Sequence, residues 1–201
     1  AADLTITPIK TLDGQKAAMI ALGGVRVSER DRIGAEGEAG AVIDEVLDIG
    51  AAAACAEGLG VMRTALGMTV EYLKTREQFG VKIGTFQALQ HRMVDMFAAC
   101  ENVRSLLYRA VCAAQENSPD ARRSVLALKV MTGRAGRLIG GEAIQLHGGM
   151  GITDELPVGS YVKRLMIINS LFGDADYHQQ LFAQLVNAPV AGASDATVKV
   201  A

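Results

Sequence analysis

The amino-acid sequence predicts a mainly α protein, an up-and-down bundle of four to five helices that follows a short β segment. Two observations carry this prediction. From about residue 40 to residue 186, apolar residues recur at steps of three and four, which is the period of an amphipathic helix. Before that point the apolar residues alternate with polar ones or form short runs beside glycines, as they do in strands. Long helices joined by short connections are typical of up-and-down bundles.

The β segment at the start of the chain predicts three short strands. Apolar and polar residues alternate over residues 3–9, and residues 14–22 form an apolar run after a turn. Residues 23–27 begin with a Gly-Gly pair, which often marks a turn before a strand. Three short strands are marginal on their own. We therefore expect them to pack on the helices or to belong to a larger sheet.

The first two predicted helices are long. The first runs from near Ala41 to Thr75, and its middle, residues 50–60, consists almost wholly of small residues. Small residues let a neighbouring backbone or a ligand lie close, and tight helix packing is the commoner reason for them. The second, residues 84–117, has apolar residues at alternating steps of three and four, a seam about 50 Å long at the standard rise.

Three shorter helices are predicted to follow. Ser118 is the expected N-cap of a third helix over residues 119–143, in which proline takes the first position. A fourth helix covers residues 157–172. Asp174 can cap a fifth helix over residues 175–186, because an aspartate oxygen accepts a hydrogen bond from a free amide of the first turn.

Composition narrows the function classes. The net charge is −2, and the 20 basic and 22 acidic residues are spread along the chain. The sequence therefore predicts no concentrated basic surface that would bind nucleic acid or an anionic membrane. The chain has no visible signal peptide and no apolar run near the roughly 20 residues of a membrane span. Cys55, Cys100 and Cys112 lie among apolar residues without metal-ligand spacing, so we expect reduced core thiols. We expect a cytoplasmic protein that binds no metal.

The connection between the first two helices holds residues that could bind a nucleotide. Arg76 offers a fork of donors suited to phosphate, Phe79 a flat apolar surface, and Gln87 a donor and an acceptor. The alternative is that Arg76 forms a surface ion pair with Glu77 while Phe79 plugs the end of the bundle. Periodicity alone favours this alternative.

The connection between the third and fourth helices is rich in glycine. Gly148, Gly149 and Gly151 leave successive backbone amides open to an anion, and Gln145 can add a side-chain donor. The alternative is a helix C-cap followed by an ordinary turn. His147 beside them is more often a histidine bonded to the backbone than a catalyst.

Two segments resemble the C-terminal helical domain of the acyl-CoA dehydrogenase family: YLKTREQFGVKIGTFQALQHRMVDM (residues 72–96) and AIQLHGGMGITDELPVGSYVKR (residues 143–164). They are similar in particular to pimeloyl-CoA dehydrogenase small subunits and to the heteromeric enzymes of steroid side-chain breakdown. Residues 13–34 resemble the end of that family's middle β domain. The resemblance implies three parts: residues 1–38 as a β-domain remnant, residues 39–187 as an FAD-binding and oligomerising bundle, and residues 188–201 as a flexible tail.

The resemblance implies an FAD-dependent oxidation of an acyl-CoA thioester to the trans-2-enoyl-CoA. It further implies a homo- or hetero-oligomer, a dimer or tetramer, whose FAD lies across a subunit boundary, and an electron-transfer acceptor protein as a partner. The positions that match the FAD-binding residues of the family are Arg76, Gln78, Phe79, Gln145, Gly148 and Gly149. The chain begins at an alanine and lacks the other domains of the family, so we expect a piece of something longer.

The catalytic base of the family has no equivalent that can take a proton. Its usual glutamate falls on Phe172, and the position used by a minority of members falls on Gly50. The chain can be a non-catalytic subunit whose partner supplies the base, or the base can have moved to Asp174 or Asp48, or the alignment can slip locally. A hypothesis of another class is a helical assembly module without an enzymatic role.

Overall fold

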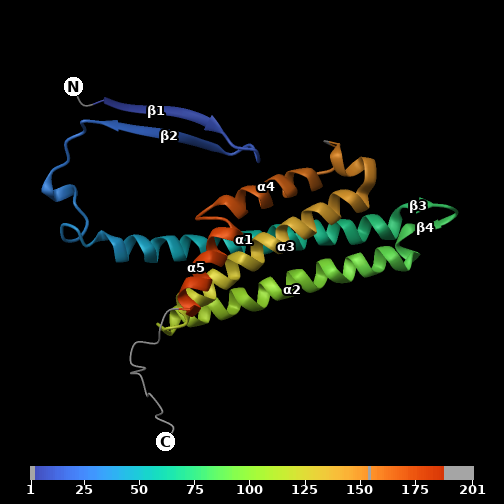
Figure 1. Ribbon diagram of the computed structural model, residues 1–201. Coiled ribbons are helices and arrows are strands. Elements are labelled where there is room, and N and C mark those ends of the chain that lie inside the picture. Colours follow the sequence, from blue (N-terminus) through green and yellow to red (C-terminus); the bar gives the residue numbers. More distant parts are fainter. Residues whose placement is uncertain (1–2, 154, 188–201) are drawn as a thin grey trace, which may run out of the picture.

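The computed structural model describes residues 3–153 and 155–187 and confirms the mainly α fold (Figure 1). The predicted tail, residues 188–201, lies outside the described residues. The five helices of the described part are α1 Ala39–Thr75, α2 Gln87–Gln115, α3 Ala121–His147, α4 Val158–Ser170 and α5 Ala175–Asn187. The strands are β1 Asp3–Lys10, β2 Lys16–Gly23, β3 Glu77–Gln78 and β4 Val81–Lys82. None of the described helices has both the length and the apolar content that a membrane crossing requires.

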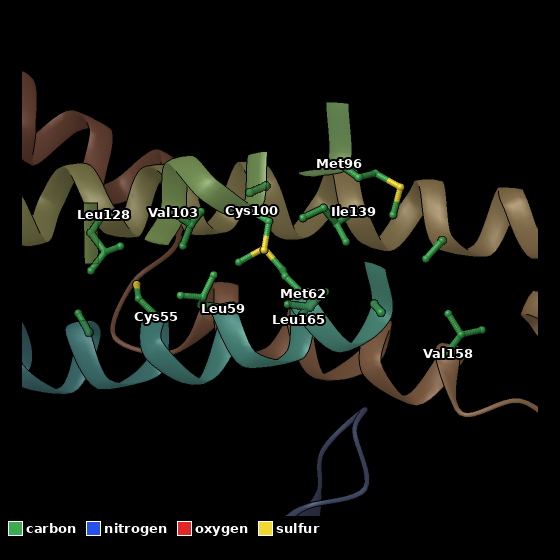
Figure 2. Packing of buried hydrophobic residues seen from close by; sticks show 14 of the residues in the cluster. Cys55, Leu59, Met62, Met96, Cys100, Val103, Leu128, Ile139, Val158 and Leu165 are labelled. Carbon is green, nitrogen blue, oxygen red and sulfur yellow. The ribbon is translucent and has the colours of Figure 1, made fainter. Parts of the chain in front are cut away.

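Helices α1 to α4 alternate in direction, α5 runs at an angle to them, and α3 lies at the centre of the bundle (Figure 1). It packs against α1, α2, α4 and α5, as Figure 1 shows. The core between these helices is built from fully buried apolar residues (Figure 2), among them Cys55, Met62, Met96, Cys100, Val103, Leu128, Ile139 and Val158. Cys112 is exposed, so the prediction that all three cysteines are core thiols was wrong for this one.

The small residues in the middle of α1 serve helix packing, as the sequence favoured. A Cβ placed on Gly58 would lie 3.1 Å from Cγ2 of Thr132 and 3.3 Å from Cγ2 of Ile168. The surface of α1 therefore lies in contact with side chains of α3 and α4. Ala51 and Ala54 on the same helix are buried. Larger side chains here would force the helices apart.

The second and third helices differ from the prediction at both of their ends. The third helix begins at Ala121 rather than at Pro119, because Ser118 starts a turn in which its carbonyl accepts the amide of Ala121 at 2.9 Å. This helix also continues to His147. The second helix begins only at Gln87, after a 3-10 turn, and ends at Gln115. Asn117 has a φ of 49°, which no helix continues through.

The prediction of a third strand at residues 23–27 was wrong. The sheet of β1 and β2 has two strands, paired from Asp3 and Gly23 to Lys10 and Lys16. Gly24 has a φ of 61° and ends the β conformation. The turn of this hairpin approaches α4 in Figure 1. Apolar residues on both faces of the hairpin are exposed, for example the paired Ile6 and Ile20 on one face and Met19 on the other.

An arginine on α4 joins the β1–β2 turn to the bundle. The guanidinium of Arg164 forms two hydrogen bonds with the carboxylate of Glu57 on α1, at 2.6 and 2.8 Å. Its third nitrogen lies 2.6 Å from Oδ2 of Asp13 in the turn. Hydrogen bonds from Thr11 and Arg164 lower the pKa of Asp13 to about 2. The contact therefore stays ionic at neutral pH and positions the hairpin against α1 and α4.

A buried lysine holds the corner between α4 and α5. The side chain of Lys129 on α3 is 1% exposed, and its Nζ donates to the carbonyls of Ile168, Asn169 and Gly173 at 3.1, 2.8 and 2.6 Å. Three donors indicate the ammonium form, although burial lowers the pKa of Lys129. These carbonyls are at the end of α4, where a helix needs donors and where its dipole attracts a cation.

Candidate functional site

The two connections singled out in the sequence lie at the same end of the bundle, as Figure 1 shows. One is the β3–β4 hairpin between α1 and α2, and the other is the 3-10 turn Gly148–Ile152 after α3. The helices that lead into them, α1 and α3, meet through two aromatic rings. The ring of Tyr72 near the end of α1 lies against that of His147 at the end of α3, with 4.6 Å between the ring centroids.

The β3–β4 hairpin presents Arg76 and Phe79 to solvent. Phe79 and Gly80 have φ values of 57° and 78°, as the two central residues of a type I′ turn require. Phe79 is 90% exposed, so it does not plug the end of the bundle. Arg76 ends α1 and is exposed. Its guanidinium forms no ion pair among the described residues, so the expected alternative, a pair with Glu77, was wrong.

The glutamines beside these residues are also exposed. Gln78 donates from Nε2 to the carbonyl of its neighbour Glu77 at 2.8 Å, a local contact that a ligand can replace. Gln87 is the first residue of α2. Gln145 lies on the last turn of α3.

The glycines of the second connection have different structural roles. Gly148 has φ 59° and ψ −138°, a combination that only glycine adopts readily. A Cβ on Gly148 or Gly149 would meet no atom within 4 Å, so their backbone is open to a ligand. Gly151 is buried, and a Cβ there would lie 2.6 Å from the carbonyl oxygen of Ile144. The third glycine therefore serves packing rather than ligand approach.

His147 has the structural role that the sequence favoured. Its side chain is 3% exposed, and its Nδ1 lies 2.7 Å from the carbonyl oxygen of Ala143. Because a carbonyl can only accept, Nδ1 carries the proton of this hydrogen bond. The ring is thus fixed between the last turn of α3 and Tyr72.

These exposed residues at one end of the bundle offer groups of the kind that an anionic nucleotide needs. We use "the cradle" for the exposed residues at this end of the bundle, namely Arg76, Gln78, Phe79, Gln145, Gly148 and Gly149. Open glycine backbone lets a diphosphate approach the main chain, and the guanidinium of Arg76, which has no ion pair in the described part of the chain, offers countercharge and two donors. An exposed aromatic ring offers a flat surface to a base. The chemistry of this donor set fits a dinucleotide cofactor such as FAD.

At the other end of α4, Phe172 covers Gly50. A Cβ on Gly50 would lie 2.5 Å from Cε1 of Phe172, so the ring lies directly on the backbone of α1. Phe172 has a φ of 57°, which is rare for a bulky residue. Buried His178 fixes its backbone, because Nε2 lies 2.8 Å from the carbonyl oxygen of Phe172. Phe172 and Gly50, the two positions to which the resemblance assigned a base, thus meet in space.

Two acids near this place, Asp48 and Asp174, are the candidates for a displaced base. Asp48 lines a cleft of about 340 Å³ together with Phe172 and Arg122. Burial raises the pKa of Asp48, and the guanidinium of Arg122 lies 3.7 Å from its carboxylate. Asp174 accepts a hydrogen bond at Oδ1 from the amide of Tyr177 at 2.8 Å. Its expected role as the N-cap of α5 is therefore confirmed.

Sequence reasoning missed two features of this region. One is Lys129, which falls on the buried face of α3 four residues after buried Val125. Its place in an apolar pattern was a signal, although nothing in the sequence identified the carbonyls that it would meet. The other is the contact of Tyr72 with His147, which depends on how α1 and α3 pack.

The fold and the two connections define a helical-bundle domain with an open cradle at one end. The chain belongs to the acyl-CoA dehydrogenase family, because residues 39–186 match the family model described as acyl-CoA dehydrogenase, C-terminal domain. The resemblance predicted from residues 72–96 and 143–164 is thereby confirmed.

Individual relatives agree with this membership. A short-chain specific acyl-CoA dehydrogenase from Megasphaera elsdenii is 34% identical over 139 residues, which are 69% of this chain and 36% of that protein. The structure of the ChsE4–ChsE5 complex from Mycobacterium tuberculosis is 26% identical with a TM-score of 0.84, covering 93% of this chain and 50% of the neighbour. The structure of PigA with FAD and proline is 26% identical with a TM-score of 0.86, and the match covers 91% of this chain and 48% of PigA. This chain therefore spans about a third to a half of the length of these relatives.

Proposed function

We propose that this chain is part of an FAD-dependent acyl-CoA dehydrogenase, which oxidises an acyl-CoA thioester to the trans-2-enoyl-CoA. The observation that carries the proposal is the cradle: Arg76 is exposed and unpaired among the described residues, at the same end of the bundle as the open backbone of Gly148 and Gly149. The relative PigA, whose structure holds FAD, adds support.

Each cradle residue has a part in holding the cofactor. Arg76 supplies countercharge and paired donors to the diphosphate, while the amides of Gly148 and Gly149 approach it from the backbone. Gln78 and Gln145 add side-chain donors, and Phe79 offers an apolar face to an aromatic ring. When bound, FAD supplies the acceptor for the hydride that leaves the β carbon of the acyl group.

The proposal includes the rest of the protein and its partners. We assign residues 1–38 to the end of the middle β domain and residues 39–187 to the FAD-binding, oligomerising bundle. The exposed apolar residues of the β1–β2 hairpin fit a sheet that continues beyond it. A homo- or hetero-oligomer, an acyl-CoA substrate and an electron-transfer acceptor protein are the partners that the proposal requires.

Replacing Arg76 with alanine tests the proposal. In the natural polypeptide that carries this sequence, together with any chain that assembles with it, the FAD dissociation constant is expected to rise about 10- to 100-fold, because a charged hydrogen bond is lost. The FAD dissociation constant of Arg76→Lys should lie between those of the wild type and Arg76→Ala, because lysine keeps the charge but lacks the paired donors of the guanidinium. The measurement is a titration of flavin fluorescence.

Arg63→Ala, an exposed arginine of α1 far from the cradle, is the matched control and should leave the constant unchanged. Equal effects of Arg63→Ala and Arg76→Ala would contradict the assignment of the cradle. A protein that takes up no FAD would support the assembly module without an enzymatic role.

A second candidate is a non-catalytic subunit of a heteromeric acyl-CoA dehydrogenase. The contact between Phe172 and Gly50 favours it, because a phenyl ring occupies the place where either usual position would hold a carboxylate. A ring cannot take the α proton, so another chain would have to supply the base. The relation to the ChsE4–ChsE5 complex, which has two differently named chains, is consistent with such an assembly.

The acids near Phe172 separate the two candidates. If the chain is a non-catalytic subunit, Asp48→Asn and Asp174→Asn should each change kcat of the assembled enzyme by less than about twofold, because neither removes a general base. If one of them is the base, its variant should lose about 100-fold or more in kcat while FAD stays bound. The measurement is steady-state desaturation of a panel of acyl-CoA thioesters, with flavin content as the control.

A further inference from the structure

We propose that Tyr72 and His147 are positioning residues that set the separation between the two halves of the cradle. This inference rests on the proposed function and adds two residues that do not belong to the cradle itself. We call the contact of their rings the clasp. It joins α1 to α3 at the end of the bundle where the cradle opens.

The clasp is close to both halves along the backbone. On one side, the carbonyl of Tyr72 accepts the amide of Arg76 at 2.8 Å, so Arg76 follows the tyrosine by one helical turn. On the other side, His147 directly precedes Gly148. The ring centroids are 4.6 Å apart and the ring planes are tilted by 33°. A shift of either ring would therefore be passed to one half of the cradle through a single turn of backbone.

The histidine ring cannot turn freely. Its side chain is 3% exposed, and its Nδ1 is held by the carbonyl of Ala143 at 2.7 Å. Tyr72 is half-buried and lies against the fixed ring. The clasp is thus a rigid contact between two helix ends rather than a chance approach of two mobile side chains.

Tight packing transmits the position of the clasp to both connections. After α3, the chain folds back so closely that a Cβ on Gly151 would lie 2.6 Å from the carbonyl of Ile144 and 3.2 Å from Cβ of His147. After β4, a Cβ on Gly84 would lie 2.8 Å from the carbonyl of Leu73. Both connections are therefore packed on the helix ends that the clasp joins.

A fixed separation matters because one diphosphate has to reach both halves. Arg76 comes from α1, while Gly148 and Gly149 follow α3, and no segment of backbone connects them directly. Errors of about 1 Å in the placement of binding groups can cost a large part of their effect. If both halves are already in place before the cofactor binds, less conformational entropy is lost on binding.

The test uses Tyr72→Leu, His147→Leu and the double variant in the natural polypeptide with its partner chain, with FAD as the ligand. Each single variant is expected to raise the FAD dissociation constant about tenfold, since groups 1 Å out of place bind poorly. The double variant should do no worse than either single one, because either change alone breaks the clasp. Tyr72→Phe keeps the ring and should stay within about twofold of the wild type.

Thermal denaturation of the same variants separates positioning from simple stability. The FAD titrations are made well below the lowest melting temperature, where all variants are folded. A purely structural role predicts lower melting temperatures with an unchanged FAD dissociation constant, and this result would overturn the inference. Additive effects of the two single variants would also overturn it. If His147→Leu does not fold, the FAD dissociation constants of Tyr72→Leu and Tyr72→Phe still test the positioning role. Both variants are expected to fold, because Tyr72 is only half-buried.

Failure of the clasp can be told apart from failure of the proposed function. If Arg76→Ala weakens FAD binding and Tyr72→Leu does not, the cradle stands and the clasp is wrong. If Arg76→Ala leaves FAD binding unchanged, the cradle itself is wrong.

Discussion

Replacing Lys129 with methionine is expected to lower the free energy of unfolding by about 3 kcal/mol or more, since several hydrogen bonds to a charged group are lost. The three carbonyls that its ammonium contacts would be left without this donor at the end of α4. Methionine fills a similar volume and cannot donate, so the variant isolates the hydrogen bonds from the packing. The measurement is urea denaturation followed by circular dichroism at 222 nm.

The matched control is Lys74→Met. Lys74 is exposed and lies 2.8 Å from Glu71 on the same helix, a surface pair of the kind worth about 0.5 kcal/mol or less. If Lys129→Met and Lys74→Met lower the stability equally, the buried ammonium does not stabilise the α4–α5 corner. We expect the Lys129 variant also to disturb Phe172, because Gly173 accepts one of the three hydrogen bonds.

Replacing Gly151 with alanine is expected to lower the free energy of unfolding by about 1–3 kcal/mol, the usual cost of overpacking. The new methyl group would lie 2.6 Å from the carbonyl oxygen of Ile144 and 3.0 Å from its Cα. Backbone atoms of a helix cannot move aside as a flexible side chain can. The 3-10 turn would have to lift from α3, which would also displace Gly148 and Gly149 and weaken FAD binding.

Gly149→Ala is the matched variant, because a Cβ there would meet no atom within 4 Å. Its stability should stay within about 0.5 kcal/mol of the wild type, as for most exposed positions. Its FAD dissociation constant should nevertheless rise, since the methyl group would face the diphosphate. The pair thus separates a glycine needed for packing from a glycine needed for the ligand. A stable Gly151→Ala variant, or a Gly149→Ala variant with unchanged FAD binding, would contradict this division.

Local patterns predicted the helices well and their ends less well. The apolar period of α1 places its helix within two residues of the observed start, and its end at Thr75 is as predicted. Period is a property of neighbouring residues, so it can be read without knowing the fold. The start of α3 was misplaced because proline and serine suit a turn as well as a helix start, and only the backbone hydrogen bonds distinguish the two.

The sequence by itself determined the family, the mainly α fold and the candidate cradle residues, because helical period and short motifs depend on residues close together in the chain. Tertiary structure decided what those residues contact. In the structure, Arg76 is exposed and has no ion pair among the described residues. Gly151 is packed against α3, whereas Gly148 and Gly149 are open, and Phe172 lies on Gly50. Each of these facts concerns which surfaces meet when helices pack. Packing joins side chains and backbone across helices whose distance and rotation no local pattern specifies.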